Sequence, residues 1–571
     1  MPSAQSSFQT PAASPESEVD AVVVGAGFAG LYMLHKLRGM GFSVRVFEEG
    51  SGVGGTWFWN RYPGARCDVE SMEYSYQFDE ALQQEWEWTE RYATQPEILR
   101  YLDHVAERFD LCRDIQFDVR VTAAQYNEAT AGWTVSTDAG DAVTASFFIM
   151  ATGCLSARNI PDFKGVDSFA GATYHTGNWP EAGVDFASQK VGVIGTGSSG
   201  IQSIPMIAEQ AEHLVVFQRT PSYSVPAHNR PLSHKEQRDF KAHYAELRSK
   251  ARQNRSGILF MVGEKGAFEV TPEDREREYE ARWAQGGVAY MGAFVDLFDT
   301  VEANDTAAEY VRSRIRHIVH DAEVAERLSP HFLIGCKRLC VDTGYYATYN
   351  RDNVTLVDVS DTPIEEITPA GLRVGGEEYE LDAIVFATGF DAVTGALTRV
   401  DIRGRDGLSF AANWDDGART MLGLSVAGFP NLFMITGPGS PSVLSNMVQS
   451  IEQHVDFIAD CLGYMREHGH SRIEARADAQ DAWVAHVNEV ADRSVYPLQD
   501  SWYIGSNISG KARVFLSYIG FPQYVAHCEK VVEKGYEGFA LDQSEPSEGA
   551  SAERERRGVR VEKGATGHER S

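Results

Sequence analysis

The chain has 571 residues, more than one hydrophobic core normally organises, so we expect two or three domains. Hydrophobic residues make up 43% of it and charged residues 23%, and the formal net charge of −29 disfavours binding to nucleic acid or to anionic membrane surfaces. Its seven scattered cysteines have no metal-binding or redox spacing, which predicts a cytoplasmic protein with reduced thiols and no metal site.

Both ends of the chain are predicted to be disordered. Residues 1–18 have neither the basic region nor the apolar region of a signal peptide, and residues 543–571 are polar and charged. No apolar run reaches the roughly 18 residues that a membrane-spanning helix needs. The predicted fold therefore concerns residues 19–542.

The first predicted unit is a strand at residues 20–24, the turn GAGFAG, a helix and a second strand that ends beside Glu48. The glycines of the turn suit a tight bend, a close approach to a pyrophosphate and close packing of helix on strand, and the amides at the helix start bind phosphate. Glu48 stands where a carboxylate accepts hydrogen bonds from ribose hydroxyl groups, as in FAD. A glycine turn alone also fits an ordinary strand–helix connection, but the flanking strand and Glu48 favour a nucleotide site.

The same order returns at residues 190–220, where the turn GTGSSG lies between a strand and a helix. Two such units imply two bound dinucleotides. The strand after the second helix ends without an acid, and Arg219 stands there instead, which suits the 2′-phosphate of NADPH. The alternative is that Arg219 is a solvated surface charge.

The rest of the chain is divided between these units and a helical insertion. Residues 132–153 are predicted to form a hairpin whose last strand rejoins the first sheet, and residues 380–391 to cross from the second unit back to the first. The predicted fold is α/β, with two Rossmann-like dinucleotide-binding domains, for FAD and NADP, and a helical insertion. The expected boundaries are 19–155 with 388–542 for the FAD-binding domain, 156–230 with 331–387 for the NADP-binding domain, and 231–330 for the insertion.

A segment before the second unit carries Phe169, Gly171, His175 and Trp179 in the pattern F-x-G-x-x-x-H-x-x-x-W-P. Between two glycine turns, this pattern resembles the signature of type I Baeyer–Villiger monooxygenases. Segments such as GGTWFWNRYPGARCDVES, CKRLCVDTGYY and GPGSPSVLSNM extend the resemblance over residues 19–542. Within the family, the chain is most similar to members of the phenylacetone type, and also to members of the steroid type.

The resemblance implies a reaction and its cofactors. In this family NADPH reduces bound FAD, molecular oxygen adds to give a flavin peroxide, and the peroxide attacks a ketone, so that one oxygen atom is inserted beside the carbonyl to give an ester or lactone. We therefore expect a ketone and molecular oxygen as partners, and sulfoxidation as a side activity. Because negative charge develops on the adduct, a fixed cation beside the flavin lowers the barrier.

Arg338 and Asp68 match the catalytic pair of the family. The resemblance implies that Arg338 stabilises the peroxide and the adduct, which suits a permanently charged group with several fixed donors. Asp68 is implied to position Arg338 through a charge-assisted pair. Arg66 is a competing partner for Asp68 because it is close in sequence, and an ion pair that only holds two domains together is the alternative function of Asp68 and Arg338.

The other expected site residues follow from the two turns and from the resemblance. The expected FAD-binding residues are Gly25, Gly27, Phe28, Ala29, Gly30, Glu48, Gly55, Thr56, Trp57, Asp68 and Tyr74. The expected NADP-binding residues are Gly195, Thr196, Gly197, Ser198, Ser199, Gly200, Arg219, Thr220, Lys337, Arg338 and Trp502. The ketone pocket is expected to be lined by Ser442, Val443, Leu444 and Met447.

Simpler functions remain open for several of these residues. Lys337 also fits a surface lysine, and Trp502 a core aromatic residue. For His175, in the segment that enters the second unit, a structural or domain-coupling function is favoured over acid–base chemistry. Cysteines beside the motifs, namely Cys67, Cys154 and Cys340, are expected to pack as small apolar side chains.

Other functions share these nucleotide units. A flavin monooxygenase that oxidises sulfur or nitrogen is disfavoured by Arg338 and by the Trp-Pro end of the signature, and a disulfide reductase by the lack of a cysteine pair. Binding motifs alone do not exclude a non-catalytic FAD/NADPH redox sensor. We expect a monomer. Differences from the family at Cys154 and at residues 518–521 leave the ketone open among aryl, cyclic and steroid compounds.

Overall fold

The computed structural model describes residues 17–542. The predicted arm and tail lie outside the described residues, except that the first strand, β1, already begins at Ser17 rather than at residue 20. The strand starts earlier because Ser17 and Glu18 pair with Val143 and Thr144 of β6. This pairing with a distant strand cannot be seen in the local sequence.

The first sheet has eight strands within the described residues, in the order β17-β4-β5-β6-β1-β2-β3, with β18 also paired to β6. β1 is parallel to β2 and β6, and β4, β5 and β6 form an antiparallel meander, as the hairpin prediction required. The strands are β1 (Ser17–Val24), β2 (Val44–Phe47), β3 (Ile115–Gln116), β4 (Val121–Asn127), β5 (Gly132–Thr137), β6 (Ala142–Met150), β17 (Asp401–Arg403) and β18 (Leu432–Met434).

Residues of β1 alternate between two cores, since successive side chains of a strand point to opposite faces of the sheet. Ala21 and Val23 face a cluster that also holds Leu34 of α1 (Phe28–Gly39) and Ile458 of α14 (Met447–His468). Val22 faces a second cluster around Trp133. The first glycine turn is therefore fixed between two packed layers.

The second sheet is parallel throughout, in the order β12-β9-β8-β16-β7. Its strands are β7 (Ala172–His175), β8 (Lys190–Ile194), β9 (His213–Gln218), β12 (Val354–Asp358) and β16 (Ala383–Phe386). α5 (Ser198–Gln210) connects β8 to β9, which confirms the second strand–turn–helix–strand prediction. After β16 the chain returns to the first sheet through β17 and β18.

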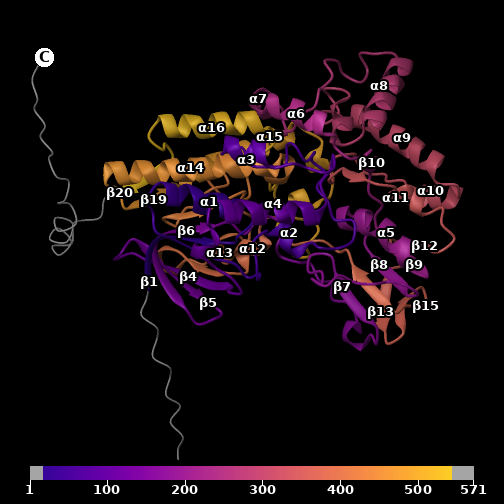
Figure 1. The fold of residues 1–571 in the computed structure, drawn as a ribbon, viewed down its shortest axis with the longest axis horizontal. Coiled ribbons are helices and arrows are strands. Elements are labelled where there is room, and N and C mark those ends of the chain that lie inside the picture. Colours follow the sequence, from indigo (N-terminus) through magenta and orange to yellow (C-terminus); the bar gives the residue numbers. More distant parts are fainter. Residues whose placement is uncertain (1–16, 543–571) are drawn as a thin grey trace, which may run out of the picture.

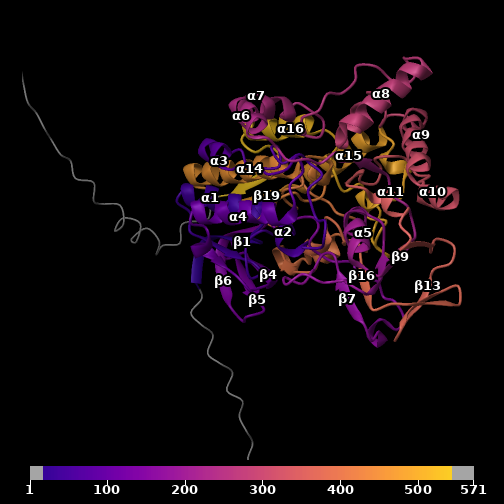
Figure 2. The ribbon, with the colours of Figure 1, turned by 45° about the vertical axis from the view of Figure 1, so that its right-hand side comes forward.

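Between residues 231 and 330 the described chain consists of helices and loops. α6 and α7 lie above the first sheet near α16, whereas α8, α9 and α10 lie above the second sheet (Figures 1 and 2). Their bounds are α6 (His234–Ala242), α7 (Tyr244–Arg252), α8 (Pro272–Gln285), α9 (Val301–Ile318) and α10 (Ala322–Leu328). None of the helices in residues 17–542 combines the length and apolar character needed to cross a membrane.

The remaining elements are short or cover the two sheets. The other α-helices are α2 (Thr56–Trp59), α3 (Glu80–Glu85), α4 (Gln95–Arg108), α11 (Tyr345–Thr348), α12 (Gly395–Thr398), α13 (Phe410–Asn413), α15 (Ala477–Asp492) and α16 (Phe521–Glu533). The other strands are β10 (Ser224–Pro226), β11 (Cys340–Asp342), β13 (Ile364–Thr368), β14 (Gly371–Val374), β15 (Glu377–Glu380), β19 (Arg472–Ala475) and β20 (Phe539–Asp542). The 3-10 helices are Cys112–Asp114, Val166–Ser168, Val288–Gly292, Arg405–Gly407, Ser442–Leu444, Tyr496–Leu498 and Trp502–Ile504.

Candidate active site

One continuous cavity of about 1150 Å³ opens onto both glycine turns. Most single-ligand sites measure about 300–1,000 Å³, so this volume favours more than one bound group. The predicted site residues that line it are Gly25, Gly27, Phe28, Ala29, Glu48, Gly55, Thr56, Trp57, Asp68, Tyr74, Gly195, Thr196, Gly197, Ser198, Ser199, Arg219, Thr220, Lys337, Arg338, Val443, Met447 and Trp502. Residues far apart in the sequence are thus brought to one place.

The first glycine turn is shaped to receive a phosphate-bearing group. The carbonyl oxygen of Gly25 would lie only 1.8 Å from a Cβ on Gly30, so the turn and α1 approach as closely as the prediction requires. Gly30 thus acts from behind the turn and does not line the cavity. Gly27 precedes α1 without a side-chain cap, and the first amides of the helix are therefore available to an anion.

Glu48 is buried directly after β2. Its Oε2 accepts from the amide of Ala26 at 2.7 Å and its Oε1 from the amide of Gly50 at 2.8 Å. Burial raises the pKa of Glu48, and these two hydrogen bonds act in the opposite direction. Because each carboxylate oxygen has a second lone pair, Glu48 retains capacity for ribose hydroxyl groups.

The second turn repeats this geometry. A Cβ on Gly200 would lie 2.4 Å from the carbonyl oxygen of Gly195, so Gly200, like Gly30, supports its turn from outside the cavity. Gly197 precedes α5 without a side-chain cap. The hydroxyl of Thr196 donates to the carbonyl oxygen of Thr220 at 2.9 Å, which ties the turn to the end of the next strand.

Two basic side chains lie at the end of the cavity beside this second turn. Arg219 is exposed, and Lys337 rests over the ring of Phe332 with its Nζ 4.6 Å from the centroid. Burial, followed by the neighbouring Arg219, lowers the pKa of Lys337. The Asp500 carboxylate opposes this fall in the pKa of Lys337 as the smallest of the three causes. Two adjacent cations form a site for an anion such as a phosphate.

Asp68 and Arg338 meet in the cavity across 270 residues of sequence. Nε of Arg338 donates to Oδ2 of Asp68 at 2.9 Å and Nη2 donates to Oδ1 at 3.1 Å, a two-bond geometry that fixes the plane of the guanidinium. The Asp68 carboxylate raises the pKa of Arg338 above its usual value. The competing partner, Arg66, pairs instead with Glu90 at 3.4 Å.

The predicted ketone segment adjoins Arg338. Nη1 of Arg338 donates to the carbonyl oxygen of Val443 at 3.2 Å, and Val443 and Met447 line the cavity. Ser442 and Leu444 do not line the cavity: the 3-10 turn at Ser442–Leu444 leaves Ser442 fully buried and packs Leu444 against an apolar cluster, so their place in the ketone pocket stays a prediction.

Trp502 and Cys154 complete the apolar side of the cavity. Trp502 is half-buried, lies 4.4 Å from Tyr503 between ring centroids, and lines the cavity. Cys154 is buried in the same cluster as Val443, and burial raises the pKa of its thiol to about 11. A neutral thiol packed among apolar groups agrees with the packing function expected for this cysteine.

The four residues of the signature, Phe169, Gly171, His175 and Trp179, lie outside the cavity and contact neighbouring segments of the chain. A Cβ on Gly171 would lie 2.3 Å from the carbonyl oxygen of Asp382, and Phe169 packs in the core behind the second sheet. The buried ring of Trp179 contacts Tyr174 and Phe186. These contacts favour a structural function.

His175 is held by three contacts. Its Nδ1 accepts from the amide of Gly177 at 3.0 Å, so Nε2 carries the proton and faces the carbonyl oxygen of Asn159 and the hydroxyl of Thr388, each at 3.3 Å. Burial lowers the pKa of His175. A neutral imidazole that joins the two segments around it fits the domain-coupling function.

Several cavity residues were not among the predicted site residues. The triplet Ala-Thr-Gly occurs twice after a buried strand, at residues 151–153 and 387–389, and both copies line the cavity. This repetition was the available signal. Gln202 and Tyr62 also line it; Tyr62 lies within the family-like segment GGTWFWNRYPGARCDVES and Gln202 two residues after the second glycine turn, but neither was singled out.

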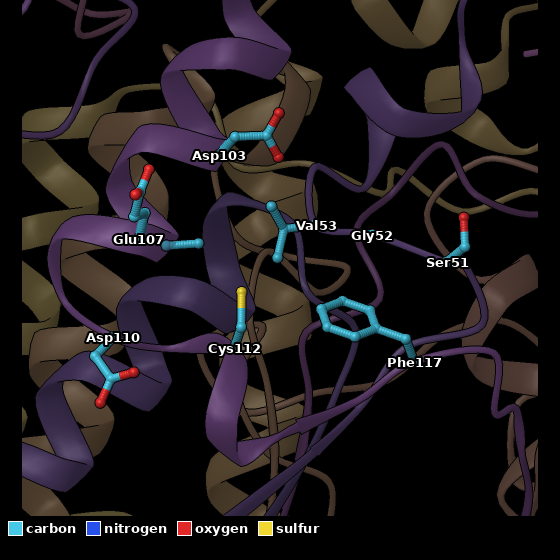
Figure 3. A pocket seen from close by; sticks show the side chains of 9 residues that line it. Ser51, Gly52, Val53, Asp103, Glu107, Asp110, Cys112 and Phe117 are labelled. Atoms are coloured by element: carbon cyan, nitrogen blue, oxygen red, sulfur yellow. The ribbon is translucent and has the colours of Figure 1, made fainter.

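A separate cavity of about 440 Å³ lies beside α4. Figure 3 shows Asp103, Glu107 and Asp110 around it, with Cys112 and Phe117. Its carboxylates would repel an anionic cofactor, and no predicted site residue lines it. Within residues 17–542, no three His, Cys, Asp or Glu side chains are placed to hold a metal ion, and the seven cysteines are unpaired.

Comparison with known proteins finds relatives over almost the whole chain. A family model described as pyridine nucleotide-disulphide oxidoreductase matches residues 22–258. The chain is 45% identical over 533 residues to a Baeyer–Villiger monooxygenase of Pseudooceanicola batsensis, covering 92% of this chain and 97% of that protein. It is 40% identical over 537 residues to phenazine N-monooxygenase PhzNO1 of Lysobacter antibioticus, covering 93% and 98%.

A solved structure extends the similarity to three dimensions. An oxidised steroid monooxygenase bound to NADP matches with a TM-score of 0.89 at 51% identity, covering 92% of this chain and 100% of that chain. The chain therefore belongs to the type I Baeyer–Villiger monooxygenase family.

Proposed function

We propose that this protein is an NADPH- and oxygen-dependent flavoprotein monooxygenase that inserts one oxygen atom beside a ketone carbonyl to give an ester or lactone. The observation that carries the proposal is the two-bond pair of Arg338 and Asp68 in the cavity shared by both glycine turns. Membership in the family supports it.

FAD and NADPH are the cofactors. FAD is held at the first turn, where bare backbone faces the cavity: a Cβ on Gly55 would lie 2.9 Å from the Cα of Gly27. The first backbone amides of α1 bind the phosphates of FAD, and Glu48 binds the ribose of FAD. When bound, FAD supplies the two-electron transfer that links NADPH to oxygen. The reaction balances as ketone, O₂, NADPH and a proton giving ester, NADP⁺ and water.

Arg338 stabilises the negative charge that develops on the carbonyl oxygen of the ketone. A guanidinium has five N–H donors, and Asp68 and Val443 accept from three of them. The remaining donors serve an oxygen atom in the cavity. Because Asp68 holds the group before the substrate arrives, no reorganisation is needed as the charge develops.

Arg219 and Lys337 hold the 2′-phosphate of NADPH, and the amides that begin α5 hold its pyrophosphate. Arg219→Ala is expected to weaken NADPH binding about 10- to 100-fold, because a charge-assisted hydrogen bond contributes about 1.5–3 kcal/mol. The ratio of the dissociation constants for NADPH and NADH, measured by titration of the flavin protein, checks this.

NADH lacks the 2′-phosphate, so its affinity is expected to stay unchanged in Arg219→Ala. Arg351→Ala is the matched control, since Arg351 is an exposed arginine beside the second sheet that does not line the cavity. An unchanged preference of Arg219→Ala for NADPH over NADH would refute the assignment.

Product analysis tests the reaction itself. NADPH and oxygen are supplied with one aryl ketone, one cyclic ketone, one steroid ketone, one sulfide and one aromatic amine, and every product is quantified. Ester or lactone in proportion to the NADPH consumed is expected. Similarity to a phenazine N-monooxygenase favours N-oxidation as the second candidate. Oxidised sulfide or amine without any ester would replace the proposal, and NADPH oxidation that no substrate accelerates would indicate a redox sensor.

Three further expectations belong to the proposal. The FAD-binding domain comprises 19–155 with 388–542, the NADP-binding domain 156–230 with 331–387, and the insertion 231–330. The chain acts as a monomer, which size-exclusion chromatography with light scattering checks. It acts in the cytoplasm, as the spacing of its cysteines favours.

A further inference from the structure

A loop of the first unit docks onto the helix that follows the second glycine turn. A Cβ on Gly64 would lie 2.3 Å from the backbone carbonyl oxygen of Gln202 and 3.0 Å from Cγ of Met206, both on α5. Gly64 has φ +84°, which an L side chain rarely adopts. Residues 62–68, called the docking loop below, therefore approach α5 more closely than any residue larger than glycine would permit.

Gln202 is the polar centre of this contact. Its Oε1 accepts from the hydroxyl of Tyr62 at 2.8 Å and from the amide of Arg66 at 3.4 Å, and its Nε2 donates to the carbonyl oxygen of Arg66 at 3.0 Å. Tyr62 is buried and Gln202 half-buried, so these bonds are shielded from water. One side chain thus holds the docking loop at Tyr62 and at Arg66, two residues before Asp68.

The same loop carries Asp68, two residues beyond Arg66. Asp68 fixes the guanidinium of Arg338 through two hydrogen bonds. α5 begins at the turn assigned to NADPH, only four residues before Gln202. A short path of hydrogen bonds therefore leads from the NADPH helix, through Gln202 and the docking loop, to Asp68 and Arg338.

We propose that Gln202 is a positioning residue that makes the placement of Asp68 and Arg338 depend on the placement of the NADPH helix. This inference rests on the proposed function. Gln202 contacts the docking loop and acts on the chemistry through Asp68. Its loss leaves NADPH oxidation in place but lowers the share of that oxidation that yields ester, with hydrogen peroxide formed instead from NADPH, O₂ and a proton.

The test compares Gln202→Leu with Gln210→Leu. Both residues are on α5, but Gln210 is exposed and lies outside the cavity. Ester, hydrogen peroxide and NADPH consumption are measured together, with FAD content and melting temperature. Ester per NADPH is expected to fall about 2- to 10-fold in Gln202→Leu, the range that corresponds to the loss of a hydrogen bond. Gln210→Leu is expected to match the unaltered protein.

Tyr62→Phe removes one of the three hydrogen bonds of Gln202 and provides a second test if Gln202→Leu fails to fold. Tyr62→Phe is expected to lower the yield of ester per NADPH less than Gln202→Leu does. The double variant is expected to have the same yield as Gln202→Leu alone, because the two residues share one contact. A lower melting temperature with unchanged ester per NADPH in Gln202→Leu, or in Tyr62→Phe if only that variant folds, overturns the inference. If the unaltered protein oxidises NADPH without forming ester from any ketone, the proposed function has failed, and the inference falls with it.

Discussion

Arg338→Ala is expected to lower the rate of ester formation about 10²- to 10³-fold while FAD binding and NADPH oxidation continue. Removal of one preorganised group that stabilises developing charge has an effect of this size. Ester formation by gas chromatography and NADPH consumption by absorbance, measured in the same reactions, separate the two processes. Hydrogen peroxide is expected to account for the NADPH that yields no ester.

Arg338→Lys is the graded control for this prediction. A lysine retains the positive charge but cannot make two parallel bonds to Asp68, so its ester formation is expected to lie between those of Arg338→Ala and the unaltered protein. Ester formation by Arg338→Ala at the rate of the unaltered protein would mean that the pair with Asp68 only holds the structure together.

Gly30→Ala is expected to remove most of the bound FAD. The added Cβ would lie 1.8 Å from the carbonyl oxygen of Gly25, a backbone atom that moves only if the turn opens. Forcing atoms into a packed site costs about 1–3 kcal/mol, or roughly 5- to 150-fold in affinity if the whole cost falls on the bound state. The ratio of flavin to polypeptide after purification and the melting temperature measure the effect.

Gly39→Ala is the matched control on the same helix. No atom lies within 4 Å of a Cβ at this position, which ends α1. Full FAD content is expected, with a stability gain of up to about 1 kcal/mol because alanine is the better helix former. If Gly30→Ala retains one FAD per chain and an unchanged melting temperature, the close approach of turn and helix is not what the site requires.

Local sequence patterns were sufficient for the two strand–turn–helix–strand units. An apolar strand, a glycine turn and a helical period are short-range signals, and β1, α1, β2 and β8, α5, β9 lie where those signals occur. The start of β1 was the exception, because Ser17 extends the strand by pairing with Val143 of β6. A strand boundary that depends on a partner more than a hundred residues away cannot be predicted from the local sequence.

The partners of charged residues were decided by the tertiary structure. Proximity in sequence made Arg66 a competitor for Asp68, yet Arg66 pairs with Glu90, and Asp68 with Arg338. Only the resemblance to a family suggested the second pair. The segment that holds Ser442 and Leu444 illustrates a related point: a 3-10 turn runs through it, and of its predicted pocket residues Val443 and Met447 line the cavity whereas Ser442 and Leu444 do not.

By itself, the amino-acid sequence determined the α/β class and the positions of both glycine turns, since backbone geometry over a few consecutive residues carries that information; the type of ribose that each turn suits stays a prediction. Only the tertiary structure showed the contacts that bring Gln202, Asp68 and Arg338 to one cavity, because contacts between segments so far apart in sequence depend on how the two sheets pack together.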